Sequence, residues 1–223
     1  MSRKNIILVV LVVVLGAMGV GYYALSGTGG GGANDDGRAG YTLVATDRGM
    51  GNPKAPVTVI EYGAPSCSIC AYFTANIFPD LKKNYIDTGK VYYVFRVFPL
   101  RPEDGDVEKM ARCLPEDKYF PFLDLFWRNQ PKWDAAEYPG ITDPHGEMIK
   151  LGRIAGLSSE QMQQCIDNKA EDARINKVAA EAEDRYHINA TPTFIIDGML
   201  QPSGALPYEQ LSKIIDAELA KKK

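Results

Sequence analysis

Two cysteines separated by two residues, Cys67 and Cys70, are the feature that most constrains how this chain can fold. They follow an apolar, strand-like run at residues 57–62 and precede a segment with helical spacing. Two intervening residues let one helical turn bring the two sulfurs within bonding distance. The first sulfur then lies at a helix N-terminus, where unpaired N–H groups and the helix dipole stabilise a thiolate. The pattern favours dithiol–disulfide exchange, in which one thiolate attacks and its neighbour resolves the mixed disulfide.

The same two thiols could instead form an inert bridge or bind a metal ion. A four-cysteine zinc site usually contains two C-x-x-C pairs, whereas the other cysteines, Cys113 and Cys165, stand alone and far apart. The non-enzymatic alternative is a Cu(I)- or Zn-binding module with Cys67 and Cys70 as soft ligands. The chain has only two histidines and no methionine cluster beside the motif. The sequence therefore favours redox chemistry with no metal site and no cofactor.

The N-terminal segment indicates export. Residues 1–26 contain Arg3 and Lys4 followed by an uncharged stretch at residues 6–25, which is typical of either a signal peptide or a membrane anchor. Both readings leave the two basic residues in the cytoplasm and export the remainder. Exported compartments are oxidising, which suits disulfide chemistry.

A glycine-rich stretch at residues 27–40 is predicted to be a flexible linker. The folded domain is then expected at residues 41–223, long enough for one domain with an insertion. The chain has a formal net charge of −3 and no basic patch apart from its terminal lysines. We therefore expect no nucleic-acid binding.

The order of predicted elements indicates an α/β domain. Strands are expected at residues 41–44, 57–62, 91–98 and 193–196, and Asp197-Gly198 predicts a hairpin turn to a return strand. The catalytic helix is expected to begin at Ser66, a suitable N-cap. A mostly helical segment, approximately residues 101–187, separates the third and fourth of these strands. A final helix is expected to open at Pro207.

Three segments together resemble the DsbA-type proteins of the thioredoxin-fold superfamily. They are Gly51-Asn52-Pro53-Lys54-Ala55-Pro56-Val57, Cys67-Ser68-Ile69-Cys70 and Ala190-Thr191-Pro192-Thr193-Phe194. The resemblance extends from about residue 41 to the C-terminus. It implies a thioredoxin fold, that is, a central mixed sheet flanked by helices, with a helical insertion domain.

The resemblance also implies roles for residues outside the cysteine pair. Pro192 is expected to follow a cis peptide bond, the alternative being a trans proline that starts an edge strand. Thr191 and Pro192, with Ser68 and Ile69, are expected to contact substrate. Glu61, six residues before Cys67, corresponds to a carboxylate that helps move the proton of the second thiol. An acid in an apolar strand should have a raised pKa, although Glu61 could instead face outward at the strand end.

The chain departs from the DsbA pattern between its cysteines. The usual dipeptide is Pro-His, whereas this chain has Ser68-Ile69. Ile69 offers neither charge nor hydrogen bond to a thiolate. We therefore expect a higher Cys67 pKa and a less oxidising disulfide than in typical DsbA proteins. Thr191 also resembles the residue that precedes the cis-proline in isomerase and reductase relatives.

Cys113 and Cys165 both lie in the predicted insertion. Export and an even cysteine count suggest a structural disulfide between them. Two buried free thiols or a second redox pair remain the alternatives.

These observations predict a thiol–disulfide oxidoreductase whose catalytic residues are Cys67, Cys70 and Glu61. A DsbA-like dithiol oxidase is favoured, and an isomerase or reductase of the same fold is the alternative. The expected substrates are exported polypeptides that contain cysteine. The expected redox partner is a membrane protein, either a quinone-linked oxidase or a reductase. The predicted location is periplasmic or extracytoplasmic, with anchoring through residues 6–25 if the N-terminal segment is retained.

Overall fold

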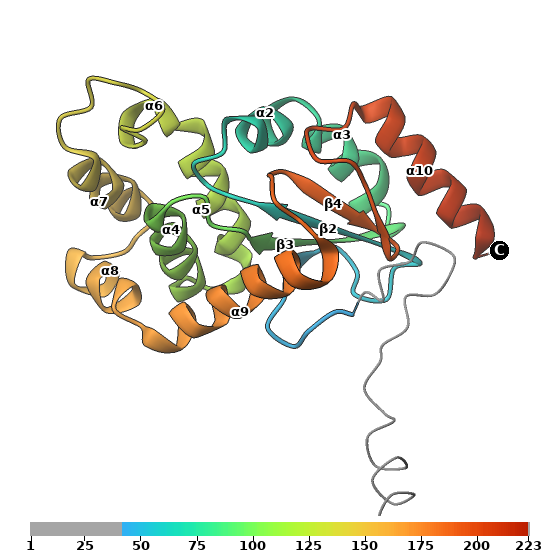
Figure 1. Ribbon diagram of the computed structural model, residues 1–223, viewed down its shortest axis with the longest axis horizontal. Helices are drawn as coiled ribbons and strands as arrows, with labels where there is room; N and C mark the ends of the chain where they lie inside the picture. The colour runs from blue at the N-terminus through green and yellow to red at the C-terminus, as the bar shows by residue number, and fades with distance from the viewer. Residues whose placement is uncertain (1–41, 223) are drawn as a thin grey trace, which may run out of the picture. The chain divides into compact units, whose positions relative to one another are not determined.

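The computed structural model describes residues 42–222, which form a mixed β-sheet flanked by helices (Figure 1). The strands are β1 (Arg48–Met50), β2 (Val57–Gly63), β3 (Val91–Val97), β4 (Thr193–Ile196) and β5 (Met199–Leu200). The expected signal or anchor (residues 1–26) and linker (residues 27–40) lie outside the described residues. Within residues 42–222, no helix is both long enough and apolar enough to span a bilayer.

The helices of residues 42–222 occupy three parts of the sequence. Between β2 and β3 are α2 (Ser68–Asn76), α3 (Phe78–Leu81) and a π-helical turn (Lys82–Ile86). Between β3 and β4 are α4 (Pro102–Cys113), α5 (Glu116–Arg128), α6 (Gln130–Trp133), α7 (Pro144–Ile154), α8 (Ser159–Ile166) and α9 (Lys169–Tyr186). The helix α10 (Tyr208–Lys221) follows β5 and begins after Pro207, which is its N-cap.

The strand order in the sheet is β1-β3-β2-β4-β5. β2 and β3 run parallel, and the other three neighbouring pairs are antiparallel. Every residue of β2 except Thr58 is buried, as its apolar sequence predicts for a central strand. The chain therefore leaves the buried centre of the sheet at Gly63 and enters the loop that carries Cys67.

Helices cover both faces of the sheet. On one face Ile60, Tyr62 and Val94 pack with Ala182 and Tyr186 of α9. The opposite face belongs to the larger core, which includes α2, α10 and the insertion helices. Its members from these three parts include Phe73, Leu211, Ile215, Phe126 and Trp127. The carboxyl end of β2 thus meets α2 and the insertion on the same side.

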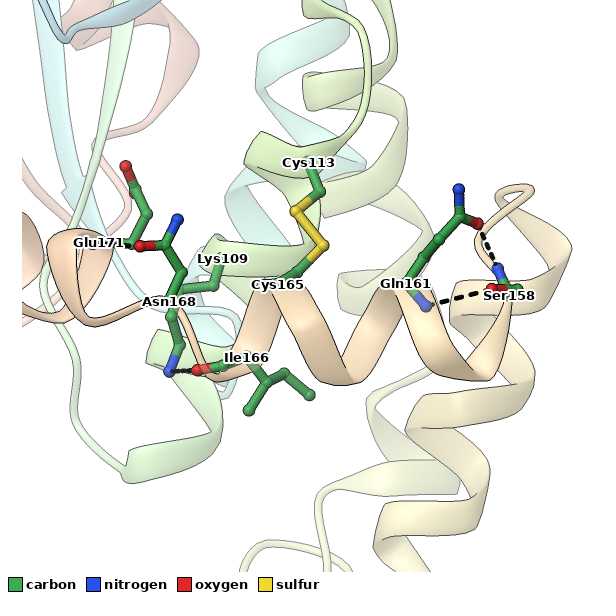
Figure 2. Close-up of a disulfide and its surroundings, with 8 residues drawn as sticks. All are labelled: Lys109, Cys113, Ser158, Gln161, Cys165, Ile166, Asn168 and Glu171. Carbon is green, nitrogen blue, oxygen red and sulfur yellow. Dashed lines mark hydrogen bonds between the residues drawn. A yellow bond between two sulfur atoms is a disulfide. The ribbon is translucent and has the colours of Figure 1, made fainter.

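A disulfide ties two helices of the insertion together. Cys113 at the end of α4 is bonded to Cys165 on α8, with a Cα–Cα distance of 6.1 Å (Figure 2). Lys109 Nζ, one turn earlier on α4, donates to Ile166 O at 2.7 Å. The bridge spans 52 residues of sequence, for which the chain-entropy model gives roughly 4 kcal/mol of stabilisation. The insertion is therefore a cross-linked unit.

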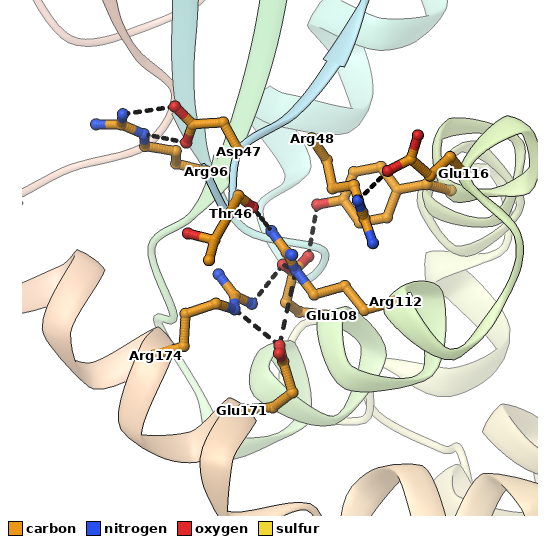
Figure 3. Close-up of polar contacts among 10 residues, drawn as sticks. Thr46, Asp47, Arg48, Arg96, Glu108, Arg112, Glu116, Glu171 and Arg174 are labelled. Atoms are coloured by element: carbon orange, nitrogen blue, oxygen red, sulfur yellow. Dashed lines mark hydrogen bonds and ion pairs between the residues drawn. The ribbon is translucent and has the colours of Figure 1, made fainter. Parts of the chain in front are cut away.

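A buried ion cluster attaches the insertion to the segment before β1. Glu108 on α4 is fully buried and pairs with Arg112 and with Arg174 of α9 (Figure 3). Tyr119 OH donates to the same carboxylate at 2.6 Å. Arg112 also donates to Thr46 O at 2.9 Å. Because a buried carboxylate is stable only when its charge is compensated, this cluster fixes α4 against α9 and against the segment that leads into the sheet.

The prediction of a strand at residues 41–44 is wrong for residues 42–44, which are the ones that the structure describes. Residues 42–44 are irregular and precede a turn, and the first strand is β1. Val44 N donates to Asp47 Oδ2, and Asp47 N returns a bond to Val44 O, both at 2.9 Å. Because Val44 N, Val44 O and Asp47 N are hydrogen-bonded within this turn, they cannot pair with a neighbouring strand. The first strand therefore begins at Arg48.

Candidate active site

The first active-site cysteine caps the helix that follows β2. Cys67 has extended backbone angles, φ −76° and ψ 115°, and its Sγ accepts a hydrogen bond from Cys70 N at 3.1 Å. Ser66, expected as the N-cap, is displaced from that role because its N–H and hydroxyl both donate to Asp104. The expectation for Ser66 is therefore wrong by one residue, and the cap is the reactive sulfur itself.

The surroundings of Cys67 stabilise its thiolate. The Cys70 thiol, as a hydrogen-bond partner, is the main cause that lowers the Cys67 pKa from 9.0 to about 6. Burial raises the Cys67 pKa, whereas hydrogen bonds with Thr191 and with the backbone N–H groups of Ile69 and Cys70 lower it further. At neutral pH Cys67 is thus mostly ionised.

The second cysteine has the opposite character. Cys70 is fully buried in the first turn of α2. Burial raises its pKa well above the ordinary value of 9.0, and the hydrogen bond to Cys67 and the negative charge of Glu61 act in the same direction. One sulfur of the pair is therefore a nucleophile at neutral pH, and the other remains a thiol.

A loop before β4 borders the reactive sulfur. The peptide bond between Thr191 and Pro192 is cis. Cys67 Sγ lies 3.4 Å from Thr191 O. Gly204 N donates to Pro192 O at 2.7 Å and Thr193 Oγ1 donates to Ala190 O at 2.7 Å, so neighbouring segments hold the loop in place beside α2.

Glu61 lies on β2 and faces the interior. Its side chain is fully buried, and its Oε2 accepts a hydrogen bond from Tyr93 OH on β3. Burial raises the pKa of Glu61 from 4.5 to about 8, the Tyr93 bond opposes this, and the charge of Cys67 adds to it. Glu61 is therefore protonated at neutral pH, and the alternative of an outward-facing acid is wrong.

Gly63 keeps the second oxygen of Glu61 open toward Cys70. Glu61 Oε1 has no hydrogen-bond partner within the described residues. A Cβ added at Gly63 would lie 2.9 Å from that oxygen and 3.5 Å from Cys70 Sγ. The missing side chain thus leaves a small space at Gly63 that both the carboxyl group and the buried thiol border.

The residues between the cysteines face outward. Ser68 is exposed, and Ile69 has 47% of its surface exposed. Beside them, a groove of about 310 Å³ runs between α2 and the insertion. Ala71 and Tyr72 line it on one side, and Trp127 lines it on the other. Ile69 offers an apolar contact next to the reactive sulfur, with no polar group that could pair with it.

Four residues that contact this site were not predicted from the sequence. Tyr93 could have been found, because the parallel register pairs Glu61 with Phe95 and so places Tyr93 on the same face of β3. Asp104, Trp127 and Gln130 contact the loop before Cys67 from the insertion. No local pattern marks those three, since the contacts cross 38 to 65 residues of sequence.

The sequence model of the family described as thioredoxin matches residues 44–217. The chain belongs to the thioredoxin family. A protein of Rickettsia conorii that is named as a protein-disulfide oxidoreductase is 31% identical over 179 residues. The match covers 79% of this chain and 62% of that relative, so this chain spans less than two thirds of its length.

Two further relatives support the DsbA-type resemblance. The disulfide bond formation protein D of Bacillus subtilis is 25% identical over 177 residues, which is 76% of each chain. The crystal structure of alpha-DsbA1 from Wolbachia pipientis superposes with a TM-score of 0.72 at 27% identity, covering 80% of this chain and 94% of that one. The predicted thioredoxin fold and DsbA-type resemblance are confirmed.

Proposed function

We propose that this chain is an exported thiol–disulfide oxidoreductase that acts as a dithiol oxidase on cysteine-containing polypeptides. The observation that carries the proposal is the position of Cys67 Sγ, which accepts a hydrogen bond from Cys70 N at the N-cap of α2 and lies 3.4 Å from Thr191 O. The N–H donor at the start of the helix stabilises this sulfur as a thiolate. Stabilising the reduced form makes the corresponding disulfide a better oxidant.

The proposed cycle begins with Cys67 and Cys70 joined as a disulfide. A substrate thiolate attacks Cys67 Sγ, which forms a mixed disulfide and releases Cys70 as a thiolate. A second substrate thiolate then attacks the substrate sulfur of that mixed disulfide and releases the Cys67 thiolate. Two substrate thiols are oxidised to one disulfide, and the Cys67–Cys70 pair takes up the two electrons.

In this proposal, Glu61 donates the proton that the Cys70 thiolate takes up. The buried Cys70 thiolate formed in the first step needs a proton, because its pKa is raised well above 9.0. Glu61, whose pKa is about 8, holds a proton at neutral pH and faces Cys70 across the space at Gly63. Donation from Glu61 removes the basic leaving thiolate and so favours the forward step.

The substrate chain is assigned to the surface around the reactive sulfur. Thr191 O lies 3.4 Å from Cys67 Sγ and precedes Pro192, and the exposed Ser68 and Ile69 directly follow Cys67 in the chain. A membrane redox partner, a quinone-linked oxidase, would accept the two electrons and restore the disulfide. The periplasmic or extracytoplasmic location, and anchoring through residues 6–25, belong to the same proposal.

The direction of electron flow is tested by the reduction potential of the Cys67–Cys70 pair against glutathione. A Cys67 pKa of about 6 lies between the values of about 3.5 for DsbA and about 7 for thioredoxin. We therefore expect a potential between about −120 and about −220 mV, together with disulfide formation in a reduced, unfolded test protein. A potential at or below about −270 mV would instead support the reductase alternative.

The same preparation tests the metal-binding alternative. Within residues 42–222, no group of three or more metal-ligating side chains is assembled. Metal analysis after dialysis is expected to give well under one equivalent of zinc or copper. Stoichiometric retained metal without exchange activity would contradict the proposed oxidoreductase.

A further inference from the structure

The loop that leads into the nucleophile is held by side chains of the insertion. Residues 64–66 join β2 to the N-cap Cys67. Trp127 Nε1 on α5 donates to Ala64 O at 3.1 Å, and its ring packs edge-on against Phe95 of β3. α5 also packs along α2 on the groove side. The insertion thus lies directly against the entrance to the catalytic helix.

Gln130 provides the most direct of these contacts. Its side-chain amide donates to Pro65 O at 2.7 Å and to Cys67 O at 3.0 Å. Gln130 is only 2% exposed and begins α6. Cys67 O also accepts the first hydrogen bond of α2, from Ala71 N at 3.0 Å. One buried amide therefore binds the carbonyl groups on both sides of Ser66.

Asp104 holds the residue between those carbonyls. Its carboxylate, fully buried near the start of α4, accepts from Ser66 N at 2.7 Å and from Ser66 Oγ at 2.9 Å. The same carboxylate accepts from Leu100 N and Arg101 N at 2.9 and 3.0 Å. Ser66 is thereby bound to the point where the insertion leaves the sheet.

These contacts affect the reactive sulfur in two ways. First, they fix the direction in which the chain enters α2, which keeps Cys67 Sγ within hydrogen-bonding distance of Cys70 N. Second, Gln130 donates N–H groups to two carbonyl oxygens of the segment that carries the thiolate, Pro65 O and Cys67 O. Both effects favour the charged sulfur, because a thiolate is stabilised by donors and destabilised by unscreened acceptors nearby.

We propose that Gln130 is a positioning residue through which the helical insertion keeps Cys67 in its reactive geometry. This role deepens the proposed function. It rests on that function in one respect only, which is that Cys67 is the nucleophile. It gives the insertion a role in the chemistry as well as in packing. The titratable groups around Cys67 are Cys70, Glu61 and Asp104, of which Asp104 is hydrogen-bonded to the preceding residue, Ser66. A substitution of Gln130 leaves all three groups in place.

Gln130→Met tests the proposal, because methionine preserves the side-chain length and removes both hydrogen bonds. The readout is the rate at which iodoacetamide alkylates Cys67 as a function of pH, with the modified residue located by peptide mass. We expect the midpoint of the Cys67 profile to rise by about 0.5–1 pH unit, and the rate at pH 6 to fall about 2- to 5-fold. This readout requires no exchange activity, so it remains informative if the proposed function fails.

Asn129→Met is the matched control. Asn129 lies between α5 and α6, and its amide donates at 2.8 Å to Leu125 O of α5. Among the described residues, its amide makes no hydrogen bond to the loop before Cys67. We expect a loss of stability similar to that of Gln130→Met but an unchanged alkylation midpoint. An unchanged midpoint in Gln130→Met with lowered thermal stability would show a merely structural role and overturn the proposal.

A second variant covers the case in which Gln130→Met does not fold. Trp127→Phe removes the donor to Ala64 O and retains an aromatic ring against Phe95. The proposal predicts an upward shift of the Cys67 midpoint here too, smaller than for Gln130→Met because Ala64 lies farther from the sulfur along the chain. A midpoint identical to wild type in the folded Trp127→Phe protein would contradict it.

Discussion

Replacing Cys67 with serine is expected to abolish disulfide exchange, with turnover of a reduced test protein reduced at least about 1,000-fold. Cys70 cannot take over, because it is fully buried and its pKa is raised well above 9.0. Replacing Cys70 with serine should have a different outcome. The Cys67 thiolate then still attacks the disulfide of an oxidised test protein, which forms a mixed disulfide and releases one substrate thiolate. No neighbouring thiol resolves this mixed disulfide, so covalent adducts accumulate on non-reducing gels.

The two outcomes together identify which sulfur meets the substrate. Mass analysis of the trapped adduct is expected to place the linkage on Cys67. The Cys113→Ala/Cys165→Ala double variant serves as the control and should retain exchange at temperatures where it is folded, since that pair joins α4 to α8. Undiminished exchange by Cys67→Ser, or adducts attached to Cys113 or Cys165, would contradict the proposed mechanism.

Replacing Glu61 with glutamine is expected to stabilise the reduced protein at alkaline pH and to slow exchange. The folded-state pKa of Glu61 is about 8, against 4.5 for the exposed side chain. Its contribution to stability is therefore fully present below pH 4.5 and is lost as the pH rises through about 8. Glutamine has no proton to lose, so the variant should exceed wild type by about 2–4 kcal/mol near pH 8.5, and by little below pH 4.5.

The kinetic effect of Glu61→Gln has the opposite sign. Without the carboxyl proton, the departing Cys70 thiolate must be protonated by solvent in a fully buried position, so exchange at pH 7 should fall about 10- to 100-fold. Urea unfolding as a function of pH and single-turnover exchange measure the two effects separately. Glu183→Gln, a substitution at an exposed position on α9, should change neither. A variant less stable than wild type at pH 8.5 would refute the buried, protonated carboxyl group.

The parts of the site that could be predicted from the sequence are those that depend on a local residue pattern or on a short motif. The strand before the cysteines is buried on both faces, so its run of apolar residues was sufficient to place β2 and, within it, Glu61. The cysteine spacing was sufficient to place one sulfur at a helix start. Pro192 followed from the resemblance, since residues 191 and 67 meet only through the fold.

The parts that were not predicted depend on tertiary contacts. Ser66 has the right chemistry for an N-cap, but Asp104, 38 residues away, competes for its hydroxyl and its N–H. Gln130 looks like any polar helix residue until the fold brings its amide to two carbonyls of the loop. The wrong strand at residues 41–44 has a local cause, because the Asp47 carboxylate closes a turn with Val44 N.

The central claim is that Cys67, as the N-cap of α2, is a thiolate at neutral pH while Cys70 remains protonated. The most direct test is the pH titration of the reduced protein, followed by iodoacetamide alkylation with each modified cysteine located by mass. The account predicts a single midpoint near pH 6 for Cys67 and no reaction of Cys70 below pH 9. A Cys67 midpoint near 9.0, the ordinary value for a thiol, would contradict it.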